Sequence, residues 1–422
     1  MKSPFFKSQR PFLRLTLSLV LLVLGPQVMA VRAQSPAVPN SREESAAAKA
    51  SNAFAFDVLN ALKSDTTQSG NVAFSPFNLW SALTMTSGGA AGDTLKEMQK
   101  ALHADSLRDV HVRAGELTAQ LQATPGTELR IANRLFAAPG LALVPAFDEL
   151  LKKHYGTEIS RVPFSSDPRS ECNQINKWVA GQTANKIQRL LRPSQISADT
   201  PLILVNAIYF KAFWESPFRP HLTLPYPFTR ASGKIMKSPM MSSLRDMPYF
   251  ETTDFQAVRL EYKGGKTSCT LLLSGKGRKV SLTAALFEKI QAGFTTQKVA
   301  LKVPRFTLEQ QLDCVPILQS LGMKLPFSKK QADFSAMGTL DVKVRKSLYL
   351  DAVAHEAFVK VNEEGTEATA ATTVKLVPVC MPPPETAKPK EFIADRPFYF
   401  FITQEETGVI LFMGKVDKPD LK

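Results

Sequence analysis

The chain has 422 residues, of which 44% are apolar and 21% charged, with 29 prolines against 21 glycines. This composition excludes an intrinsically disordered chain and a collagen-like repeat, and it is typical of a globular protein with a large core. The formal net charge is +14, but five basic and no acidic residues fall in residues 1–33, so the rest of the chain carries +9. Charges of both signs are interspersed there, which indicates a mixed solvated surface and gives no support to nucleic-acid binding.

Residues 1–33 have the pattern of a secretory signal peptide. Four basic residues precede the apolar run 15–24, and Ala30 and Ala33 follow it at cleavage spacing. The run is too short to span a bilayer, and no other apolar run is long enough. We therefore expect export to the periplasm or the extracellular space after cleavage near Ala30 or Ala33, with no membrane association. A flexible tail is expected over residues 34–45.

Helical spacing of apolar residues is found mainly in the first half of the chain. It predicts amphipathic helices over residues 46–63, around Leu83 and Met85, and over 94–102 and 172–191. A short strand-like run over residues 71–74 is stopped by Pro76.

Strand patterns dominate the second half. Buried or alternating strands are predicted at residues 202–210, 299–303 and 357–361, and two apolar runs around the turn 405–408 predict a C-terminal hairpin. The expected fold class is α+β, with several helices around a large mixed or antiparallel main sheet. We expect residues 46–422 to form a single domain.

Motifs of catalysis and of metal binding are missing from the sequence. His355 and Glu356 begin like a zinc-protease motif, but Val359 stands where the second histidine ligand is needed. Neither a nucleophile elbow nor a phosphate-binding loop occurs. We therefore expect no enzyme activity, no catalytic residue, no metal and no cofactor.

The four cysteines are far apart in the sequence, with no paired spacing. They allow three disulfide connectivities, among which sequence cannot choose, and we expect most of them to be single thiols. They are Cys172, Cys269, Cys314 and Cys380.

The segment from Glu363 to about Asp395 departs from the pattern around it, because it lies between two strand-like runs and is too long for an ordinary connection. Its second half contains five prolines and cannot join a sheet interior. Its first half alternates with the period of a strand. The even positions are small or apolar and never charged: Thr366, Ala368, Ala370, Thr372, Val374 and Leu376.

The odd positions of this half, from Glu367 to Val377, carry both of its charges. One face of the strand is therefore suited to burial. Gly365 precedes it, and glycine permits backbone dihedrals that other residues avoid. The pattern predicts a strand that is held out of its sheet, where a disordered linker is the alternative.

Residues 363–372 resemble the hinge of the inhibitory serpins, the serine protease inhibitor family. The resemblance extends over nearly the whole mature chain, and the matching segments follow in the order of the family. They are Asn71 with Phe74-Ser75-Pro76, residues 205–211 with Trp214 and Phe218, 351–357, 395–398 and 412–416.

This resemblance implies a suicide inhibitor that a target serine protease cleaves in an exposed reactive-centre loop, residues 363–390. The protease is then held in a covalent complex while the freed strand inserts into the main sheet. The family pattern implies a scissile bond between Val379 and Cys380, and a small branched residue there suits an elastase-like pocket. Lys375 is the alternative cleavage residue. A monomer is expected.

The resemblance also implies roles for three groups of residues. The hinge is Gly365, Thr366, Glu367, Ala368, Thr369, Ala370, Ala371 and Thr372. The shutter, which controls opening of the sheet, is Ser75, Pro76, Asn206 and His355, with Asn78 where many members have serine. The breach, where the strand first enters, is Glu363, Arg305 and Trp214, with a surface ion pair between the first two. The alternative is that the shutter residues are ordinary core polar groups.

The sequence leaves three functions to be considered: an inhibitory serpin, a non-inhibitory serpin that acts as a binding or chaperone-like protein, and an unrelated secreted enzyme. The uncharged even positions favour inhibition, since non-inhibitory members often carry bulky, charged or proline residues there. Nothing in the sequence supports the enzyme. A polyanion site near His111 and Arg113 is left open, because the positive charge there is sparse.

Overall fold

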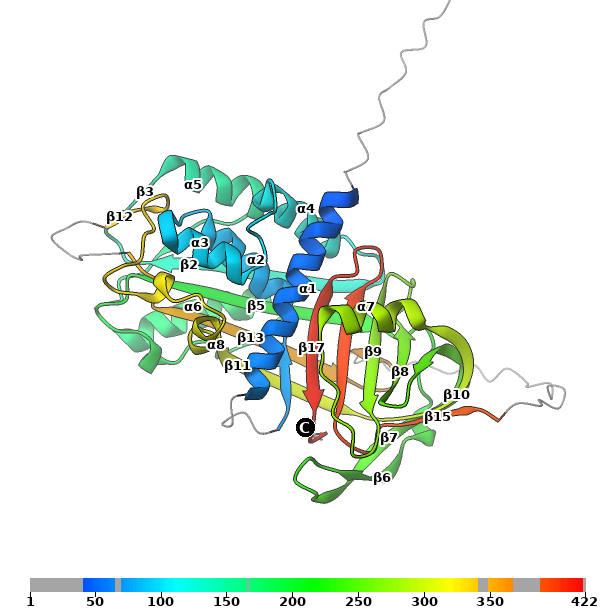
Figure 1. Ribbon diagram of the computed structural model, residues 1–422. Coiled ribbons are helices and arrows are strands. Elements are labelled where there is room, and N and C mark those ends of the chain that lie inside the picture. Colours follow the sequence, from blue (N-terminus) through cyan, green and yellow to red (C-terminus); the bar gives the residue numbers. More distant parts are fainter. Residues whose placement is uncertain (1–40, 65–69, 165–166, 341–347, 367–387, 420–422) are drawn as a thin grey trace, which may run out of the picture. The chain divides into compact units, whose positions relative to one another are not determined.

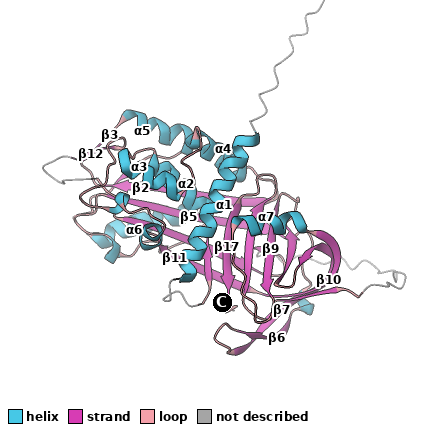
Figure 2. Cartoon of the chain, viewed as in Figure 1, coloured by secondary structure: helices cyan, strands magenta, loops and turns pink. Residues whose placement is uncertain are grey.

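Two large sheets and a group of helices account for most of the described residues, which in this computed structural model are 41–64, 70–164, 167–340, 348–366 and 388–419. The expected α+β class is confirmed. Helices α2 to α4 lie together, and α1 runs between them and the sheet that contains β17 (Figures 1 and 2). The helices are α1 (Ser41–Ser64), α2 (Pro76–Ser87), α3 (Gly92–Ala101), α4 (Val110–Gln122), α5 (Pro145–Leu150), α6 (Pro168–Gln182), α7 (Ala284–Gly293) and α8 (Val315–Ser320).

The first large sheet has nine strands and is mainly antiparallel. The C-terminal hairpin predicted from the sequence lies in this sheet as β16 and β17. The edge strand of the sheet, β15, pairs in parallel with β10. Its strands are β1 (Val72–Phe74), β17 (Ile410–Val416), β16 (Phe398–Gln404), β9 (Thr267–Ser274), β8 (Phe255–Glu261), β7 (Ile235–Glu251), β10 (Thr295–Pro304) and β15 (Lys390–Ile393) in order, with β6 (Leu224–Thr229) on β7.

The second large sheet has six strands and is mixed. A small third sheet joins β12 (Gly338–Leu340) to β3 (Leu141–Leu143). The six strands lie in the order β11 (Phe306–Asp313), β13 (Ala352–Val361), β14 (Gly365–Thr366), β5 (Leu202–Phe213), β2 (Thr127–Ala137) and β4 (Ser160–Arg161).

Strand β5 of this sheet and helix α2 lie at the centre of the hydrophobic core. Residues 202–210 of β5 are all buried, as expected for a central strand covered on both faces. Helix α2 starts at Pro76, whose fixed φ suits the first helical position, and every one of its residues is buried.

Several boundaries differ from those predicted. Helix α1 begins at Ser41, so residues 41–45 belong to a helix and not to a flexible tail, while 34–40 lie outside the described residues. The helix predicted over 172–191 ends at Gln182, because Ala184 and Asn185 adopt left-handed φ values of 51° and 59°. Strand β15 was missed, since it follows Pro389 in the proline-rich segment.

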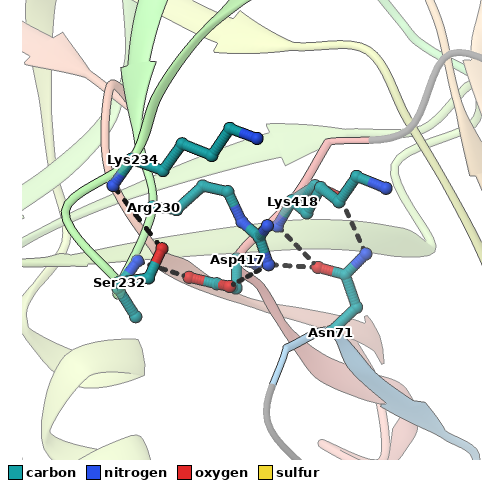
Figure 3. Close-up of polar contacts among 7 residues, drawn as sticks. Asn71, Arg230, Ser232, Lys234, Asp417 and Lys418 are labelled. Carbon is teal, nitrogen blue, oxygen red and sulfur yellow. Dashed lines mark hydrogen bonds and ion pairs between the residues drawn. The ribbon is translucent and has the colours of Figure 1, made fainter.

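A polar cluster ties the end of β17 to the first strand and to the turn between β6 and β7 (Figure 3). The buried carboxylate of Asp417 accepts hydrogen bonds from the backbone N–H of Ala231 (2.6 Å) and from Arg230 Nη2 (3.2 Å). Asn71 Oδ1 accepts from the N–H groups of Asp417 and Lys418, each at 2.8 Å. Asn71, which opens one of the family-like segments, thus fixes the chain's C-terminal edge.

Candidate functional site in the six-stranded sheet

The candidate site is a seam between β13 and β5. The two strands pair in parallel only from Ala352–Ala357 to Ile203–Ile208. Beyond that ladder the short strand β14 lies between them, antiparallel to both, with Gly365 opposite Phe213 and Thr366 opposite Ala212. The strands β13 and β5 are therefore hydrogen-bonded to each other along one half of the seam, which is the closed half. At the other half, the two residues of β14 lie between them.

Gly365 is required here by close backbone approach. A Cβ at this position would lie 2.1 Å from the carbonyl oxygen of Ala212 and 2.7 Å from the Cα of Phe213. The φ of Gly365 is not left-handed. The sequence argument from unusual dihedrals was therefore wrong in its reason, because glycine is needed for lack of space between two strands.

Thr366 is the first residue of the uncharged face, and its side chain is 1% exposed. Its hydroxyl shares a hydrogen bond of 2.5 Å with the hydroxyl of Tyr262. The Tyr262 ring stacks on Trp214 with centroids 4.4 Å apart and an interplanar angle of 11°. The even face of the segment thus begins against the core, and the described part of the hinge ends at this residue.

The breach residues Glu363, Arg305 and Trp214 lie together at the wide end of the seam. Glu363 Oε1 accepts hydrogen bonds from Arg305 Nε (2.6 Å) and Thr223 Oγ1 (2.5 Å). Burial acts to raise the pKa of Glu363, but the hydrogen bonds from Arg305 and Thr223 outweigh it and leave that pKa below its usual value. The side chain of Glu363 is only 7% exposed, so the expected surface ion pair is half-buried.

Trp214 holds the chain just before β14. Its backbone N–H donates to Glu364 O (2.8 Å), and its indole Nε1–H donates to Asn362 O (2.9 Å). The N–H of Phe218 donates to Glu363 O at 2.8 Å. These bonds fix the segment that leads into the seam.

The shutter residues Ser75, Asn206 and His355 meet beneath the closed half of the seam. The N–H of Ser75 donates to His355 Nε2 (3.0 Å), so the ring proton is on Nδ1, which donates to Asn206 Oδ1. Asn206 Nδ2 in turn donates to Asn78 O (2.9 Å) and Asn133 Oδ1 (2.5 Å). Burial lowers the pKa of His355 to about 3, so its imidazole is neutral.

Pro76 takes no hydrogen bond in this network but starts α2, and Ser75 immediately before it also donates from Oγ to Leu411 O (2.5 Å). Asn78 takes part through its backbone carbonyl alone. Its side-chain Oδ1 and Nδ2 are buried and have no hydrogen-bond partner among the described residues. Every residue type has this carbonyl, so the side chain of Asn78 adds no hydrogen bond to the network among the described residues.

Sequence reasoning missed Asn133, Thr223 and Tyr262, which each supply a hydrogen bond to a predicted site residue. They come from three separate parts of the chain and belong to no local motif. An isolated amide inside a strand, as Asn133 is, gives the only sequence signal among them. The hinge residues from Glu367 to Thr372 and the bond between Val379 and Cys380 lie outside the described residues.

Cys172, Cys269 and Cys314 are buried free thiols, so no disulfide joins these three described cysteines. Burial raises the pKa of Cys269 to about 12. In the described part of the chain no cluster of three or more His, Cys, Asp or Glu is placed to hold a metal ion. None of the helices described is long and apolar enough to cross a membrane.

His111 does not offer a surface charge for a polyanion. Its Nδ1 lies 2.9 Å from the hydroxyl of Tyr155, and burial lowers its pKa to about 4. The neighbouring Arg113 donates to Glu116 at 2.9 Å.

The six-stranded sheet has a short strand in its central seam, above a buried Ser–Asn–His network. These features define a class of protein in which a loop begins as a strand between two central strands of a sheet. Residues 49–419 match the family model described as serpin (serine protease inhibitor). The chain belongs to the serpin family, which is described by its action on serine proteases.

Individual relatives cover most of the chain. Leukocyte elastase inhibitor A of Mus musculus is 33% identical over 387 residues, which are 88% of this chain and 98% of that protein. Serpin B8 of Bos taurus is 35% identical over 88% of this chain and 99% of its own length. The native-state crystal structure of the thermophilic serpin tengpin gives a TM-score of 0.80 at 26% identity, covering 91% of this chain and 96% of its own. The crystal structure of human thyroxine-binding globulin with bound thyroxine gives a TM-score of 0.80 at 26% identity, covering 90% of this chain and 100% of its own.

Proposed function

We propose that this chain inhibits elastase-like serine endopeptidases by loop cleavage, trapping of the acyl-enzyme and insertion of the freed strand between β13 and β5. The single observation that carries the proposal is β14, a two-residue strand already paired in the seam at the start of the loop 363–390. The protease serine would attack the carbonyl carbon of Val379, and the amine of Cys380 would leave.

The register of β14 supports the choice of the inserting face. Continued along β5 from Thr366 opposite Ala212, it would set Ala368 opposite Phe210 and Thr372 opposite Asn206. Side chains directly opposite each other share a face of the sheet, so the even positions would follow Thr366 to the buried side. None of them carries a charge.

The same register gives the shutter a physical role. Continued along β13, it would set Thr372 opposite His355, which at present lies opposite Asn206. Full insertion would therefore separate His355 from Asn206 and break their hydrogen bond. About a dozen inserted residues would gain ladder bonds worth roughly 0.5–1.5 kcal/mol each, on the order of 10 kcal/mol in total.

The choice of protease rests on Val379, whose small branched side chain suits a shallow pocket, and is supported by similarity to a relative named leukocyte elastase inhibitor A. We also propose that the protein is a secreted monomer, released by cleavage near Ala30 or Ala33. N-terminal sequencing of the protein recovered outside the expressing cells tests the release.

The test of inhibition is incubation of the mature chain with an elastase, read on a denaturing gel with mass spectrometry of the released peptide. We expect a protease–inhibitor band that survives denaturation and a peptide that begins at Cys380. A peptide beginning at Met381 or at Leu376 would move the scissile bond. Cleavage of the loop without a stable band would contradict the trapping mechanism and favour a non-inhibitory binding protein.

A further inference from the structure

A cavity of about 790 Å³ lies on the outer face of the six-stranded sheet, beneath the segment 183–193 that follows α6. Helix α6 packs on β2, where the Trp178 ring meets Phe136 edge-on at 5.6 Å. The segment is fixed at two points. Asn176 exchanges two hydrogen bonds of 2.9 Å with the backbone of Leu191, and Gln311 of β11 donates to Arg189 O at 2.9 Å. The cavity is therefore bounded by fixed structure.

The sheet side of the cavity carries a buried carboxylate without a partner. Glu356 follows His355 on β13, so it points to the opposite face, and it is 4% exposed. Its Oε2 has no hydrogen-bond partner among the described residues. Buried polar groups are nearly always paired, because an unpaired one loses its hydration without compensation.

A second carboxylate lies beside it. Gln311 is opposite Glu356 in the ladder between β11 and β13, so Glu309, two residues along β11, lies on the same face. Both acids line the cavity. Burial, and then the charge of Glu309, raises the pKa of Glu356 to about 7.

The opposite wall carries positive charge. Arg189 and Arg192 line the cavity from the segment 183–193. In the described part of the chain no ion pair joins either arginine to Glu309 or Glu356. The cavity thus presents an acidic floor and a basic wall that do not neutralise each other directly.

We propose that this cavity binds a basic amino acid or a short basic peptide, with its guanidinium or ammonium group on Glu356 and Glu309 and its carboxylate facing Arg189 and Arg192. A guanidinium matches a carboxylate through two parallel N–H···O bonds, which would satisfy the unpaired oxygen of Glu356. The volume falls within the usual range of about 300–1,000 Å³ for small-molecule sites. The inference does not depend on protease inhibition.

Three probes of closely similar shape test it by isothermal titration calorimetry on the full mature chain. L-arginine carries both charges, L-citrulline keeps the carboxylate but replaces the guanidinium with a neutral urea, and agmatine lacks the carboxylate. We expect one L-arginine site, with L-citrulline and agmatine each bound at least tenfold more weakly. Equal binding of L-arginine and L-citrulline, or no L-arginine binding at 10 mM, would overturn the proposal.

Variants locate the binding. Glu356→Gln keeps the shape and removes the charge, and it should weaken L-arginine binding at least tenfold. Glu309→Gln, at a more exposed position, should weaken it less, and Glu288→Gln on the exposed face of α7 is the matched control and should leave it unchanged. Binding that survives both Glu356→Gln and Glu309→Gln would lie elsewhere and would refute this site.

The pH profile gives an independent readout. The charged or titratable groups facing Glu356 are Glu309 from β11, Cys172 from α6, and Arg189 and Arg192 from the segment above. Ionisation of Glu356 should make L-arginine bind about tenfold more tightly at pH 8 than at pH 6. Glu356→Gln should abolish that dependence, and a pH profile identical in the variant would contradict the assignment.

Discussion

Glu356 should make the native state less stable as the pH rises. Its folded pKa of about 7 exceeds the usual 4.5, so the folded carboxyl keeps a proton that the unfolded chain releases between those two values. Stability therefore falls as the pH rises through this window, by on the order of 3 kcal/mol in all. Glu356→Gln should raise the free energy of unfolding at pH 8 by about that amount and leave it nearly unchanged at pH 4.5, as guanidinium denaturation would measure.

The control for this prediction is Glu288→Gln, whose side chain lies on the exposed face of α7. It should change the free energy of unfolding by less than about 0.5 kcal/mol at either pH. An equal gain for Glu356→Gln at pH 4.5 and pH 8 would mean that the effect is one of packing and not of ionisation.

His355 should act in the opposite direction. Its folded pKa of about 3 lies below the usual 6.5, so acidification protonates the unfolded chain first, and stability is lost as the pH falls through that window. In a Glu356→Gln background, which removes the neighbouring titration, we expect a loss of about 2 kcal/mol between pH 8 and pH 5. Protonation would also place a second proton against the N–H of Ser75.

Hydrogen exchange of the β13 amides 352–357 measures directly whether this loss of stability opens the seam between β13 and β5. These residues form the closed half of the seam with β5. Exchange in the Glu356→Gln background should accelerate between pH 8 and pH 5 after correction for the intrinsic pH effect. His355→Asn, which cannot be protonated in this range, should remove the acceleration, and its persistence in that variant would exclude His355 as the titrating group.

The hinge strand offers a matched pair of substitutions on its two faces. Thr366 is already buried in the seam opposite Ala212, so Thr366→Arg would either bury an unpaired charge there or expel β14, and the strand could not continue inserting from this residue. We expect this variant to be cleaved as a substrate, with the stoichiometry of inhibition raised at least tenfold. The stable complex on a denaturing gel should be nearly lost.

Glu367→Arg is the control for this strand, because its odd position would set it on the outer face. It should keep inhibition within about twofold of the parent chain. If both arginine variants trapped protease equally well, the assignment of the inserting face would be wrong. If both failed equally, the outer face would also have to be buried on insertion.

Local periodicity predicted the elements that depend on local pattern. Strand β5 and the hairpin of β16 and β17 were found because their apolar runs are bounded by turns. The helix ending at Gln182 was extended too far, since Ile187 and Leu190 are buried at helical spacing although the chain has already turned at Ala184. Apolar spacing reports burial, and burial alone does not distinguish a helix from a packed connection.

The partners of the site residues are beyond the reach of any local pattern. Tyr262 and Thr223 reach Thr366 and Glu363 from parts of the chain more than a hundred residues away. Strand β15 pairs in parallel with β10, a contact that only the tertiary fold creates. The family resemblance predicted where the strand enters, but the reason for Gly365 is visible only in the folded structure, where two backbones approach closely.

Strand insertion would divide the six-stranded sheet into two moving parts, β11 with β13 and β5 with β2. The segment 183–193 is joined to both parts, through α6 on β2 and through Gln311 on β11. Any widening of the seam must therefore stretch or release that segment, together with the hydrogen bond between His355 and Asn206. These contacts oppose opening until the loop is cut, which is consistent with an intact form held by a kinetic barrier.

Cleavage between Val379 and Cys380 should let the strand insert and raise the melting temperature of the protein. An added strand worth on the order of 10 kcal/mol, at about 2 °C of Tm per kcal/mol for a domain of this kind, gives a rise of about 20 °C. Differential scanning calorimetry of the intact and loop-cleaved protein measures it. Cleaved Thr366→Arg should show almost no rise, since its strand cannot enter. A cleaved parent chain that melts with the intact one would mean that the loop stays outside the sheet after cleavage, and strand insertion could not then be the trapping step.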